Sequence, residues 1–452
     1  MKKLSESDQG MWRRQITFLM ASAGAAIGIG NIWKFPYVVG ENGGGAFILM
    51  YILCVLLVGV PIFIAETVVG HEARRNPISA MHIVALQSSQ NPRWKWVGVL
   101  GCTAGLIILS YYAVVAGWGI HYLNLALDGS FQDSNVGEVG GLFIDLLSSP
   151  RQLVIMQTIF LGVVAFIVTF GVRAGLGVAS HVLIPSMMLM LGLLIAYSMR
   201  LGDLQAGLEF MFSFNPDALN WDSFWVALGH AFFSLSIGMG AMMAYGAYMP
   251  KRISIPKMVF AVALLDVLFA LLAGIAIFPI VFANGIEPSQ GPGLMFVSLP
   301  MAFGNMLFGH WMGSVFFALV VVASLSSAVA LLEPSVAWVN ERFGLPRVIG
   351  VLLISFLVWS VSLMTTLSFN VLESVTFFGG LSLFELLDFI SANLLLPISG
   401  FALAVFAGWK MDVHKFERRS YFNLWIWVLR YVTAPAVLLI FVLALIQRFS
   451  LF

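Results

Sequence analysis

A small set of polar side chains interrupts apolar segments of the sequence, and their chemistry suits a hard cation. Asp266 lies in the run AVALLDVLFALLAG, which contains no Lys or Arg. An ionisable side chain in such a segment is costly, so it is either protonated or accompanied by a cation. Sites rich in oxygen and poor in nitrogen and sulfur favour hard cations. Neutral oxygens for such a site occur in other segments, on Asn31, Ser234, Ser236, Ser326 and Ser327.

Other interpretations remain open for several polar groups. The hydroxyls of Ser326 and Ser327 could instead donate to carbonyls one turn earlier in their own helix. His230 fits a satisfied polar core residue better than a proton relay. Cys54 and Cys102 fit buried thiols better than a disulfide. No grouping of His, Cys and carboxylates has the spacing of a zinc site.

The elements that must position these groups are membrane-spanning helices. Of the 452 residues 60% are apolar and 10% are charged, and apolar blocks of about twenty or more residues recur from end to end. This spacing predicts an all-α polytopic membrane protein and disfavours a soluble helical domain, in which polar faces would dilute the pattern. We expect one transmembrane domain, residues 1–452, with eleven helices over residues 12–38, 42–70, 94–126, 152–170, 176–199, 222–249, 256–283, 311–340, 346–367, 375–408 and 421–447.

The basic residues predict how the chain is oriented in the membrane. With a cytoplasmic N-terminus, most of the 23 Lys and Arg residues fall on the cytoplasmic side, and the opposite loops are acidic. This asymmetry follows the positive-inside rule, and with eleven helices it places the C-terminus outside the cytoplasm. The net charge of +1 gives no reason to expect a nucleic-acid partner.

Two of the predicted helices contain a glycine-rich segment, which disfavours helical structure. Residues 24–31 read GAAIGIGN and residues 234–241 read SLSIGMGA, so an Ile-Gly-X-Gly pattern occurs in both the first and the sixth predicted helix. Glycine is costly inside a helix but lets backbone groups approach a ligand, and irregular backbone at membrane depth is tolerated where it lines a cavity. For the first segment alone, close helix packing through Gly24 and Gly28 is the alternative.

The two patterns stand five helices apart, which predicts an internal repeat. Two units of five helices have opposite orientations in the membrane, and their paired broken helices meet at a site near the midplane. We expect the first repeat over residues 1–199, the second over 200–408 and an additional C-terminal helix within 409–452.

Five motifs together resemble the neurotransmitter:sodium symporter family, whose members have a leucine-transporter-like fold. They are GIGNIWKFPY followed by ENGGGAFILMY, LSYYAVVAGW in the third predicted helix, ALGHAFFSLSIGMG in the sixth and ASLSSAVALLEP in the eighth. The resemblance is specific and runs from about residue 10 to residue 450. It implies a sodium-coupled symporter rather than an enzyme, and eleven helices suit a bacterial member.

The resemblance implies two sodium sites. The first uses the Ala26 carbonyl, the side chains of Asn31, Ser234 and Asp266, and the substrate carboxylate. The second uses the carbonyls of Gly24, Ile27 and Ala323 and the hydroxyls of Ser326 and Ser327. A helix N-terminus favours an anion and unpaired carbonyls favour cations, so these assignments agree with the physics of broken helices.

The resemblance also implies a site for an amino acid beside these ions. The substrate carboxylate meets the amides of Ile29 and Gly30 and the hydroxyl of Tyr112, and the ammonium group meets carbonyls of Ala26, Phe233 and Ser234, with Ser236 nearby. The side-chain pocket consists of Ile108, Phe233, Ser236, Met239, Ser327 and Leu331. Because this set lacks a charge and includes a flexible Met, we expect it to accept several bulky apolar substrates.

The predicted topology places two opposite charges, Lys34 and Asp388, near the outer side. They form either an ion pair that closes an outer vestibule or a structural pair. Tyr112 and Phe233 lie deeper, where they supply a hydroxyl and an aromatic lid.

On the cytoplasmic side, the resemblance implies a gate that includes Trp12, Tyr248 and Glu341. The Arg that usually precedes Trp12 by three residues is Gln9 here, so Glu341 lacks its expected partner. Arg13 or Arg14 could substitute for it.

The fifth predicted helix contains Gly175 and, after nine residues, Pro185. In some relatives this spacing accompanies unwinding of the cytoplasmic end of the helix, which opens a water path to the second sodium site. Proline removes a helix hydrogen bond and glycine tolerates unwound backbone, so the mechanism is physically sensible. A fixed kink is the alternative.

The sequence also departs from the family near the first sodium site. Asp266 replaces the more usual Asn, and Ala270 stands where some bacterial relatives have a Glu. We therefore expect Asp266 to supply the negative charge that chloride supplies in chloride-dependent relatives.

Together these observations predict a sodium-coupled importer of hydrophobic L-amino acids in a bacterial inner membrane, either monomeric or dimeric. The alternatives are a symporter of another amine, such as a betaine or a small osmolyte, and a nontransporting sodium-gated receptor of the same fold. No pairing of nucleophile and base and no cofactor motif indicates an enzyme.

Overall fold

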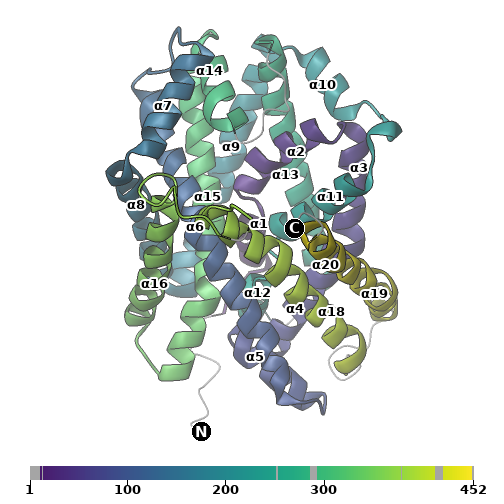
Figure 1. The fold of residues 1–452 in the computed structure, drawn as a ribbon. Helices are drawn as coiled ribbons and strands as arrows, with labels where there is room; N and C mark the ends of the chain where they lie inside the picture. Colours follow the sequence, from purple (N-terminus) through teal and green to yellow (C-terminus); the bar gives the residue numbers. More distant parts are fainter. Residues whose placement is uncertain are drawn as a thin grey trace.

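The computed structural model describes residues 11–12, 14–250, 253–285, 293–377, 379–412 and 421–449. Nearly all of this part of the chain is helical, and strand-like pairing within it is limited to isolated bridges between Gly44 and Phe214 and between Phe377 and Leu381. The helices form one bundle, with α7 (Val136–Ser148), α10 (Leu204–Phe212) and α14 (Leu299–Gly304) at one end and α5 (Pro77–Gln87) at the other (Figure 1).

Nine helices within the described residues are long and apolar enough to cross a membrane. Some contain a π-helical turn, so one span carries several labels. They are Gly45–Ala73 (α3, Gly45–Cys54, and α4, Val60–Ala73), Pro92–Leu127 (mostly α6, Lys95–Leu127), Pro150–Thr169 (α8), Val172–Leu201 (η4, Val172–Gly177, and α9, Val178–Leu201), Ile255–Ala283 (α13), Gly309–Phe343 (α15), Arg347–Leu367 (α16), Leu383–Lys410 (α17, Leu383–Phe389, and α18, Leu396–Val405) and Phe422–Leu443 (within α19, Tyr421–Val428, and α20, Ala434–Phe449).

The first and sixth predicted spans are each broken into shorter helices. An irregular turn follows α1 (Gln15–Ala26), and the chain continues through a π-helical turn η1 (Gly30–Lys34) into α2 (Phe35–Glu41). In the sixth span, residues 235–240 separate α11 (Trp221–Ser234) from α12 (Ala241–Tyr248). The glycine patterns predict both breaks, and both are confirmed. Because each broken span lacks a long helix, the number of eleven crossings stays a prediction.

One predicted boundary is wrong. The tenth span, expected over residues 375–408, is helical only from Leu383 onwards. The helix begins there because Ser382 forms a capping box with Glu385: the Glu385 amide donates to the Ser382 hydroxyl at 3.3 Å, and the Ser382 amide donates to the Glu385 carboxylate at 2.8 Å. The apolar residues that precede this cap extended the predicted span too far toward the N-terminus.

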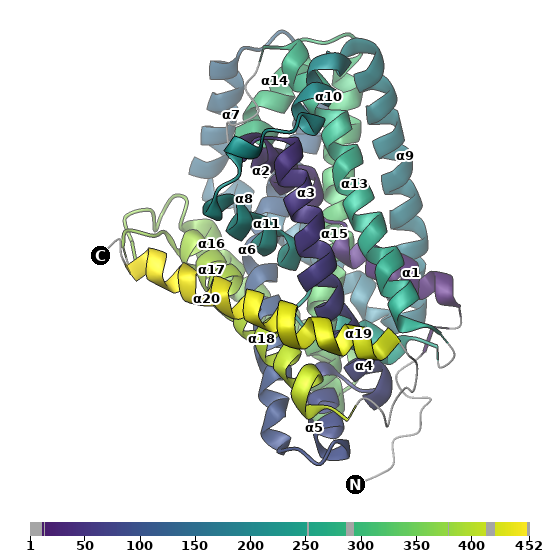
Figure 2. The same ribbon diagram turned by 90° about the vertical axis from the view of Figure 1, so that its right-hand side faces the viewer.

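The broken helices lie inside the bundle. The first, α1, packs against α9, α13 and α15, while α12 packs against α4. The two long helices α6 and α15 pack along each other beside them. The last helices, α19 and α20, run obliquely over α18 at the edge of the bundle (Figure 2). Cys54 and Cys102 are buried thiols, as predicted.

Candidate functional site

The backbone at the two breaks leaves helical geometry at particular residues. Ile27 has φ −73° and ψ 104°, an extended conformation that ends α1. At the second break Ser236 and Gly238 have φ of 50° and 80°. Left-handed backbone suits Gly but strains Ser, so the surroundings must hold Ser236 in place, and its hydroxyl donates to the Ala25 carbonyl at 2.8 Å. The amide of Gly238 donates to the buried Glu66 carboxylate at 2.6 Å.

Asp266 is the centre of a hydrogen-bond cluster that joins both breaks to α13. Its side chain is fully buried. The Ser234 hydroxyl lies 2.9 Å from Oδ1 and 2.7 Å from Oδ2, and Asn31 Nδ2 donates to Oδ1 at 2.8 Å. These donors are neutral, so no side-chain cation in this cluster compensates a charge on the carboxylate. A cation bound here would do so, which is the chemistry expected for the first sodium site.

The amide of Asn31 is oriented with its nitrogen toward Asp266. Its Nδ2 also donates to the Ser234 hydroxyl at 3.3 Å, while its Oδ1 accepts from the Gly28 amide at 3.2 Å. A role as sodium ligand therefore requires the amide to rotate, so that Oδ1 faces the carboxylate and a cation between them. Ala26, the other predicted ligand from the first break, is buried beside the same break.

Tyr51 on α3 belongs to the same cluster, although it is not among the residues predicted from the sequence. Its hydroxyl donates to Asp266 Oδ2 at 3.2 Å and to the Ser234 hydroxyl at 3.3 Å. The available signal is the single phenol in the apolar run GAFILMY, because a buried Tyr hydroxyl needs a hydrogen-bond partner.

His230 lies next to Tyr51 in the protein core. Its ring centroid is 5.1 Å from that of Tyr51 and 5.8 Å from that of Phe35. Both ring nitrogens are buried and have no hydrogen-bond partner among the described residues. The expected core location is therefore present, but the expected hydrogen bond is not.

Four of the five predicted ligands of the second sodium site meet where α1 ends against α15. The Ser327 hydroxyl lies 3.3 Å from the Ile27 carbonyl oxygen and 3.5 Å from that of Gly24. A Cβ atom on Gly24 would overlap the Ser326 hydroxyl, so any other residue there requires Ser326 and Ile184 to move. The fifth, Ala323, is buried on α15 one turn before Ser327.

The alternative for Ser326 and Ser327 was a hydrogen bond to a carbonyl one turn earlier in the same helix. Ser324, rather than Ser327, makes such a bond. Ser324 donates to the Val320 carbonyl at 2.5 Å, whereas Ser327 points across to α1. Two serines three positions apart on one helix thus make different contacts, which their spacing in the sequence does not distinguish.

A cavity of about 300 Å³, which includes space open to solvent, is lined by Ser234 of the Asp266 cluster and by Ser327 of the α1–α15 contact. Ten of the eleven predicted substrate residues line it, and Ala25 and Gly28 complete the wall. The ten are Ala26, Gly30, Ile108, Tyr112, Phe233, Ser234, Ser236, Met239, Ser327 and Leu331. The eleventh, Ile29, is buried nearby, and its amide donates to the Tyr112 hydroxyl at 3.3 Å.

The wall of this cavity contains no charged side chain. Hydroxyls of Tyr112, Ser234 and Ser327 make part of it polar, while Ile108, Met239 and Leu331 make another part apolar. A zwitterion with an apolar side chain matches this division, provided that backbone groups and ions meet its two charges.

The predicted outer ion pair is not formed in this structure. The ion pairs among the described residues join His71 to Glu72 and Arg347 to Glu333. Lys34 instead lies over the Phe233 ring, with Nζ 5.4 Å from the centroid. A role for Lys34 and Asp388 as an outer gate therefore stays a prediction for a different conformation.

On the opposite side of the cavity, Trp12 forms hydrogen bonds with η4 and α12. Its Nε1 donates to the Val172 carbonyl at 3.0 Å, and its amide donates to the Tyr248 carbonyl at 3.0 Å. The ring packs edge-on against Tyr245 and Tyr248, with centroids 5.2 and 5.8 Å away. Trp12 is 3% exposed, so this contact seals the protein at that point.

Glu341 has a partner that differs from the expected arginine. Its two carboxylate oxygens accept from the backbone and side-chain amides of Asn76, at 3.0 and 2.7 Å. Arg14 is exposed, and Arg13 and Gln9 lie outside the described residues. The structure therefore shows no contact between Arg14 and Glu341, and Asn76 is the partner of Glu341 instead.

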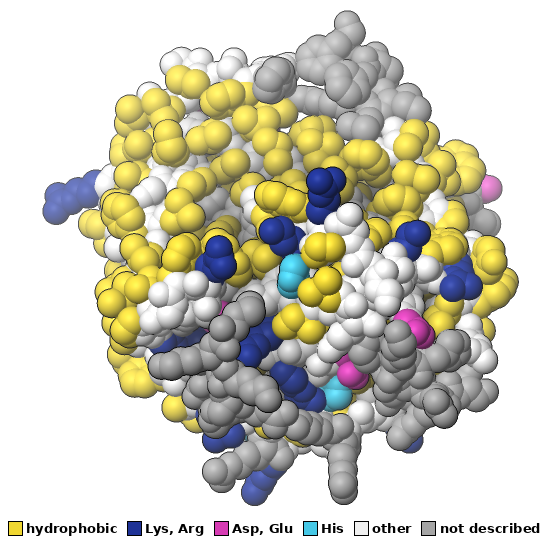
Figure 3. Space-filling model, turned by 90° about the horizontal axis from the view of Figure 1, so that it is seen from below, with side chains coloured by type: hydrophobic (Ala, Val, Ile, Leu, Met, Phe, Trp, Pro, Cys, Tyr) yellow, Lys and Arg dark blue, Asp and Glu magenta, His cyan; other side chains and the backbone are white. Residues whose placement is uncertain are grey.

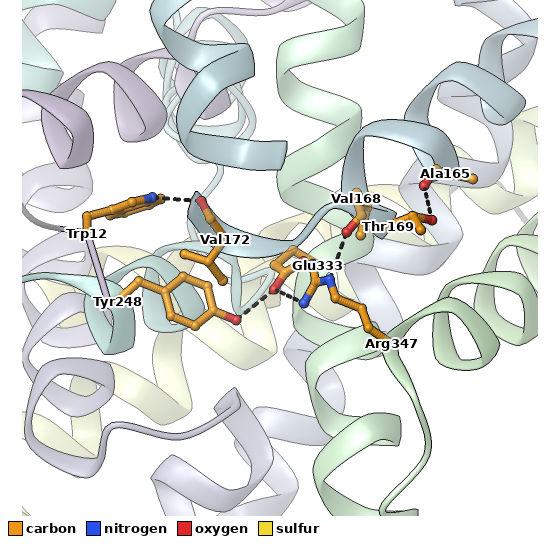
Figure 4. Close-up of polar contacts among 8 residues, drawn as sticks. All are labelled: Trp12, Ala165, Val168, Thr169, Val172, Tyr248, Glu333 and Arg347. Carbon is orange, nitrogen blue, oxygen red and sulfur yellow. Dashed lines mark hydrogen bonds and ion pairs between the residues drawn. The ribbon is translucent and has the colours of Figure 1, made fainter. Parts of the chain in front are cut away.

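Glu333 and Arg347 form a contact that is not predicted from the sequence. Arg347 forms a two-pronged ion pair with the fully buried Glu333 carboxylate, which also accepts from the Tyr248 hydroxyl at 2.7 Å (Figure 4). Burial explains the arrangement, because an unpaired carboxylate at this depth is costly. In the sequence, Arg347 looks like an ordinary basic residue at a helix end.

The N-terminal end of the fifth span, for which the sequence predicts unwinding, is helical in this structure. Gly175 lies in the π-helical turn η4, and Pro185 lies inside α9. The only sharp turn at this point is at Gly171, with φ 83°, just before η4. Unwinding between Gly175 and Pro185 stays a prediction.

Comparison with known proteins gives a consistent assignment. The profile described as the sodium:neurotransmitter symporter family matches residues 9–137 and 143–451. The structure is similar to the crystal structure of MhsT in complex with L-phenylalanine, with TM-score 0.88 and 37% identity, covering 96% of this chain and 100% of that chain.

Similar sequences come from bacteria and animals. The uncharacterized sodium-dependent transporter YhdH of Bacillus subtilis (strain 168) is 32% identical, with 97% of this chain and 98% of the relative aligned. The sodium- and chloride-dependent GABA transporter 2 of Homo sapiens is 24% identical, with 85% and 70% aligned. With its broken helices, buried carboxylate cluster and MhsT-like fold, the chain belongs to the sodium:neurotransmitter symporter family, whose members are membrane transporters and not enzymes.

Proposed function

We propose that the protein imports hydrophobic L-amino acids by alternating access, with two sodium ions per substrate and no requirement for chloride. Membership of the family supports sodium-coupled transport. The class of amino acid, the number of ions and the independence from chloride are argued from the residues around the cavity.

The observation that carries the proposal is that Ser234 belongs to two sites at once. Its hydroxyl binds the Asp266 carboxylate, and the same residue lines the central cavity. An ion held by Asp266 and a substrate in the cavity would therefore share a wall. If the substrate carboxylate completes the coordination of that ion, each ligand strengthens the binding of the other, which is the thermodynamic basis of coupling.

The lining of the cavity favours a neutral apolar side chain. Met239, Ile108 and Leu331 are buried and offer apolar contacts, and a charged substrate side chain would find no counter-charge in the wall. The Gly30 backbone and the Tyr112 hydroxyl are suited to a carboxylate. The similar structure of MhsT was determined with L-phenylalanine, which is an amino acid of this class.

Independence from chloride follows from the charge on Asp266. A sodium ion and a substrate zwitterion at the first site need one compensating negative charge in the protein interior. Asp266 is a carboxylate at the centre of that cluster, while Ala270, one turn later on α13, carries no charge. A chloride ion beside Asp266 would add a second negative charge and be repelled.

Two ions supply enough energy for steep accumulation. A tenfold sodium gradient provides roughly 1.4 kcal/mol per ion. A membrane potential of about 100 mV adds roughly 2.3 kcal/mol per charge. Two ions per zwitterion therefore provide about 7 kcal/mol, which corresponds to accumulation of about 10⁵-fold.

The proposed location is a bacterial inner membrane, with the N-terminus in the cytoplasm. Figure 3 shows many Lys and Arg side chains on the end of the molecule at which the N-terminus lies in Figure 1, and fewer Asp and Glu side chains. This distribution supports a cytoplasmic position for that end.

Counter-transport in proteoliposomes tests the substrate class. Vesicles loaded with one labelled amino acid are exposed to alanine, leucine, tryptophan or betaine in sodium or potassium buffer. We expect sodium-dependent exchange with leucine and tryptophan and none with betaine. Exchange with betaine alone would contradict the proposal, and sodium-dependent binding without any exchange would favour a receptor.

A further inference from the structure

Two backbone carbonyls, one on each side of the turn between the fourth and fifth spans, are each held by a side chain from a distant part of the chain. Val168 lies in the last turn of α8 and Val172 begins η4. Gly171 turns the chain between them, with φ 83°. Carbonyls at a helix C-terminus lack the usual partner in their own helix, so a side chain from outside can hold that of Val168.

Arg347 holds the first of these carbonyls. Its Nε donates to the Val168 oxygen at 2.7 Å, while its two terminal nitrogens bind Glu333 (Figure 4). One guanidinium group therefore joins the end of α8 to α15. Arg is suited to this task because its donors form a rigid fork, and a cation at a helix C-terminus interacts favourably with the helix dipole.

Trp12 holds the second carbonyl, that of Val172, through its indole nitrogen at 3.0 Å. Both holders are connected to Tyr248 at the end of α12. The Tyr248 carbonyl accepts from the Trp12 amide, and the Tyr248 hydroxyl donates to Glu333, which pairs with Arg347. The contacts therefore form a closed circuit through Tyr248, Glu333, Arg347, the 168–172 segment and Trp12. Figure 4 shows these side-chain contacts; the backbone bond from Trp12 to Tyr248 closes the circuit.

The circuit connects both broken helices to the fifth span. Tyr248 is the last residue of α12, and Trp12 precedes α1. The fifth span packs against α1, and a Cβ on Gly24 would lie 2.9 Å from Ile184 on α9. The fifth span is thus attached to the circuit at its first residue, Val172. Further along, at Ile184, it lies beside Gly24 of the proposed second sodium site.

We propose that Arg347 is a positioning residue for transport: by holding the Val168 carbonyl while it pairs with Glu333, it makes the α8–η4 connection, from which the fifth span begins, move only together with Tyr248 and α12. This inference rests on the proposed function, because it assigns Arg347 to the step that opens the cytoplasmic side. It concerns the link between Arg347 and the α8–η4 connection, and it requires all links of the circuit to act as one unit.

The test measures access to the first turn of α9. Ser180 is buried there, 7% exposed, so Ser180→Cys reports opening through its rate of modification by a maleimide. The background carries Cys54→Ala and Cys102→Ala, which remove the native thiols. Purified full-length protein is labelled in sodium and in potassium buffer. The test variant is Arg347→Lys, which keeps the positive charge near Glu333 but loses the fork that reaches Val168. The matched control is Arg342→Lys, the same change at an exposed residue.

We expect Arg347→Lys to raise the labelling rate about tenfold, the effect of losing one hydrogen bond from a charged donor. Arg342→Lys should leave the rate unchanged. Trp12→Phe, which removes the indole donor to Val172, should also raise the rate. Because the contacts form one circuit, the double variant should label no faster than the faster single variant. Equal rates in Arg347→Lys and Arg342→Lys would overturn the proposal, as would effects that multiply in the double variant.

A second measurement covers variants that label poorly or are less stable. Hydrogen exchange in the full-length protein should rise in peptides covering residues 168–178 for Arg347→Lys and stay unchanged for Arg342→Lys. Exchange that rises equally throughout the chain would indicate general destabilisation and would contradict a positioning role. Both measurements use no substrate. If the transport assay fails while these results appear, the proposed function fails and the coupling of Arg347 to the fifth span stands.

Discussion

The Ser234 hydroxyl lies 2.9 and 2.7 Å from the two carboxylate oxygens of Asp266. Ser234 ends α11 at the second break, and Asp266 lies in the middle of α13. Because Ser234 also lines the central cavity, any change in the charge or ligation of Asp266 acts on the cavity through one side chain. This relationship makes Asp266 the first residue to test.

Asp266→Asn should weaken sodium-dependent substrate binding about tenfold, because a neutral amide replaces the carboxylate that would balance the ion. The variant should also respond to chloride, since an anion beside the site would then restore the missing charge. Sodium titrations of binding in chloride and in gluconate measure both effects.

Asp203→Asn is the matched control for this change. Asp203 caps α10 by accepting from the Ala206 amide at 3.0 Å, and Asn caps helices equally well. It should bind sodium as the unmodified protein does. An Asp266→Asn protein with unchanged titrations in both salts would show that Asp266 does not supply the compensating charge.

Tyr51→Phe should reduce sodium affinity about fivefold, because the change removes one hydroxyl that donates to the Asp266 carboxylate without altering the shape of the ring. Tyr431→Phe, at a position 62% exposed, is the control and should have no effect. Equal sodium affinity in the two variants would remove Tyr51 from the site.

Ser326→Ala should lower the apparent sodium affinity of transport, whereas Ser324→Ala should leave it unchanged. Ser326 faces Gly24 across the helix contact, while the Ser324 hydroxyl is bonded to the Val320 carbonyl in its own helix. The comparison keeps the helix and the type of substitution constant. A larger sodium effect from Ser324→Ala than from Ser326→Ala would contradict the assignment of the second site.

Asn31→Ala, at the first sodium site, should also lower sodium affinity.

Gly24→Ala should block sodium-coupled uptake, because the new methyl group would overlap the Ser326 hydroxyl and approach Ile184. Gly192→Ala on α9 places the same methyl group where no atom lies within 4 Å, so it should transport normally. Uptake and sodium titrations of the two purified variants provide the measurement. Normal transport by Gly24→Ala would mean that close approach at this point is unnecessary.

The sequence was informative where chemistry conflicts with a membrane helix. Glycine-rich breaks and a lone Asp266 are costly in a bilayer unless they have a function, so the sequence alone predicts both as parts of a site. The capping box at Ser382 shows the opposite case: apolarity continues across a helix start, and only the local hydrogen bonds mark it.

Partners of buried polar groups were harder to predict, because they depend on how distant helices pack. Tyr51, one phenol in an apolar run, meets Asp266 across 215 positions of the sequence. Asn76 takes the place expected for an arginine at Glu341, and Arg347 reaches both Glu333 and Val168. Lys34 lies over the Phe233 ring instead of forming the predicted ion pair with Asp388.

Uptake into proteoliposomes under defined gradients tests the central claim most directly. An inward sodium gradient with an inside-negative potential should drive accumulation of labelled leucine or tryptophan, with net inward charge movement and equal rates in chloride and gluconate. Replacing sodium by potassium should abolish it. Accumulation that persists without sodium, or sodium-dependent binding without accumulation, would contradict sodium-coupled amino-acid import.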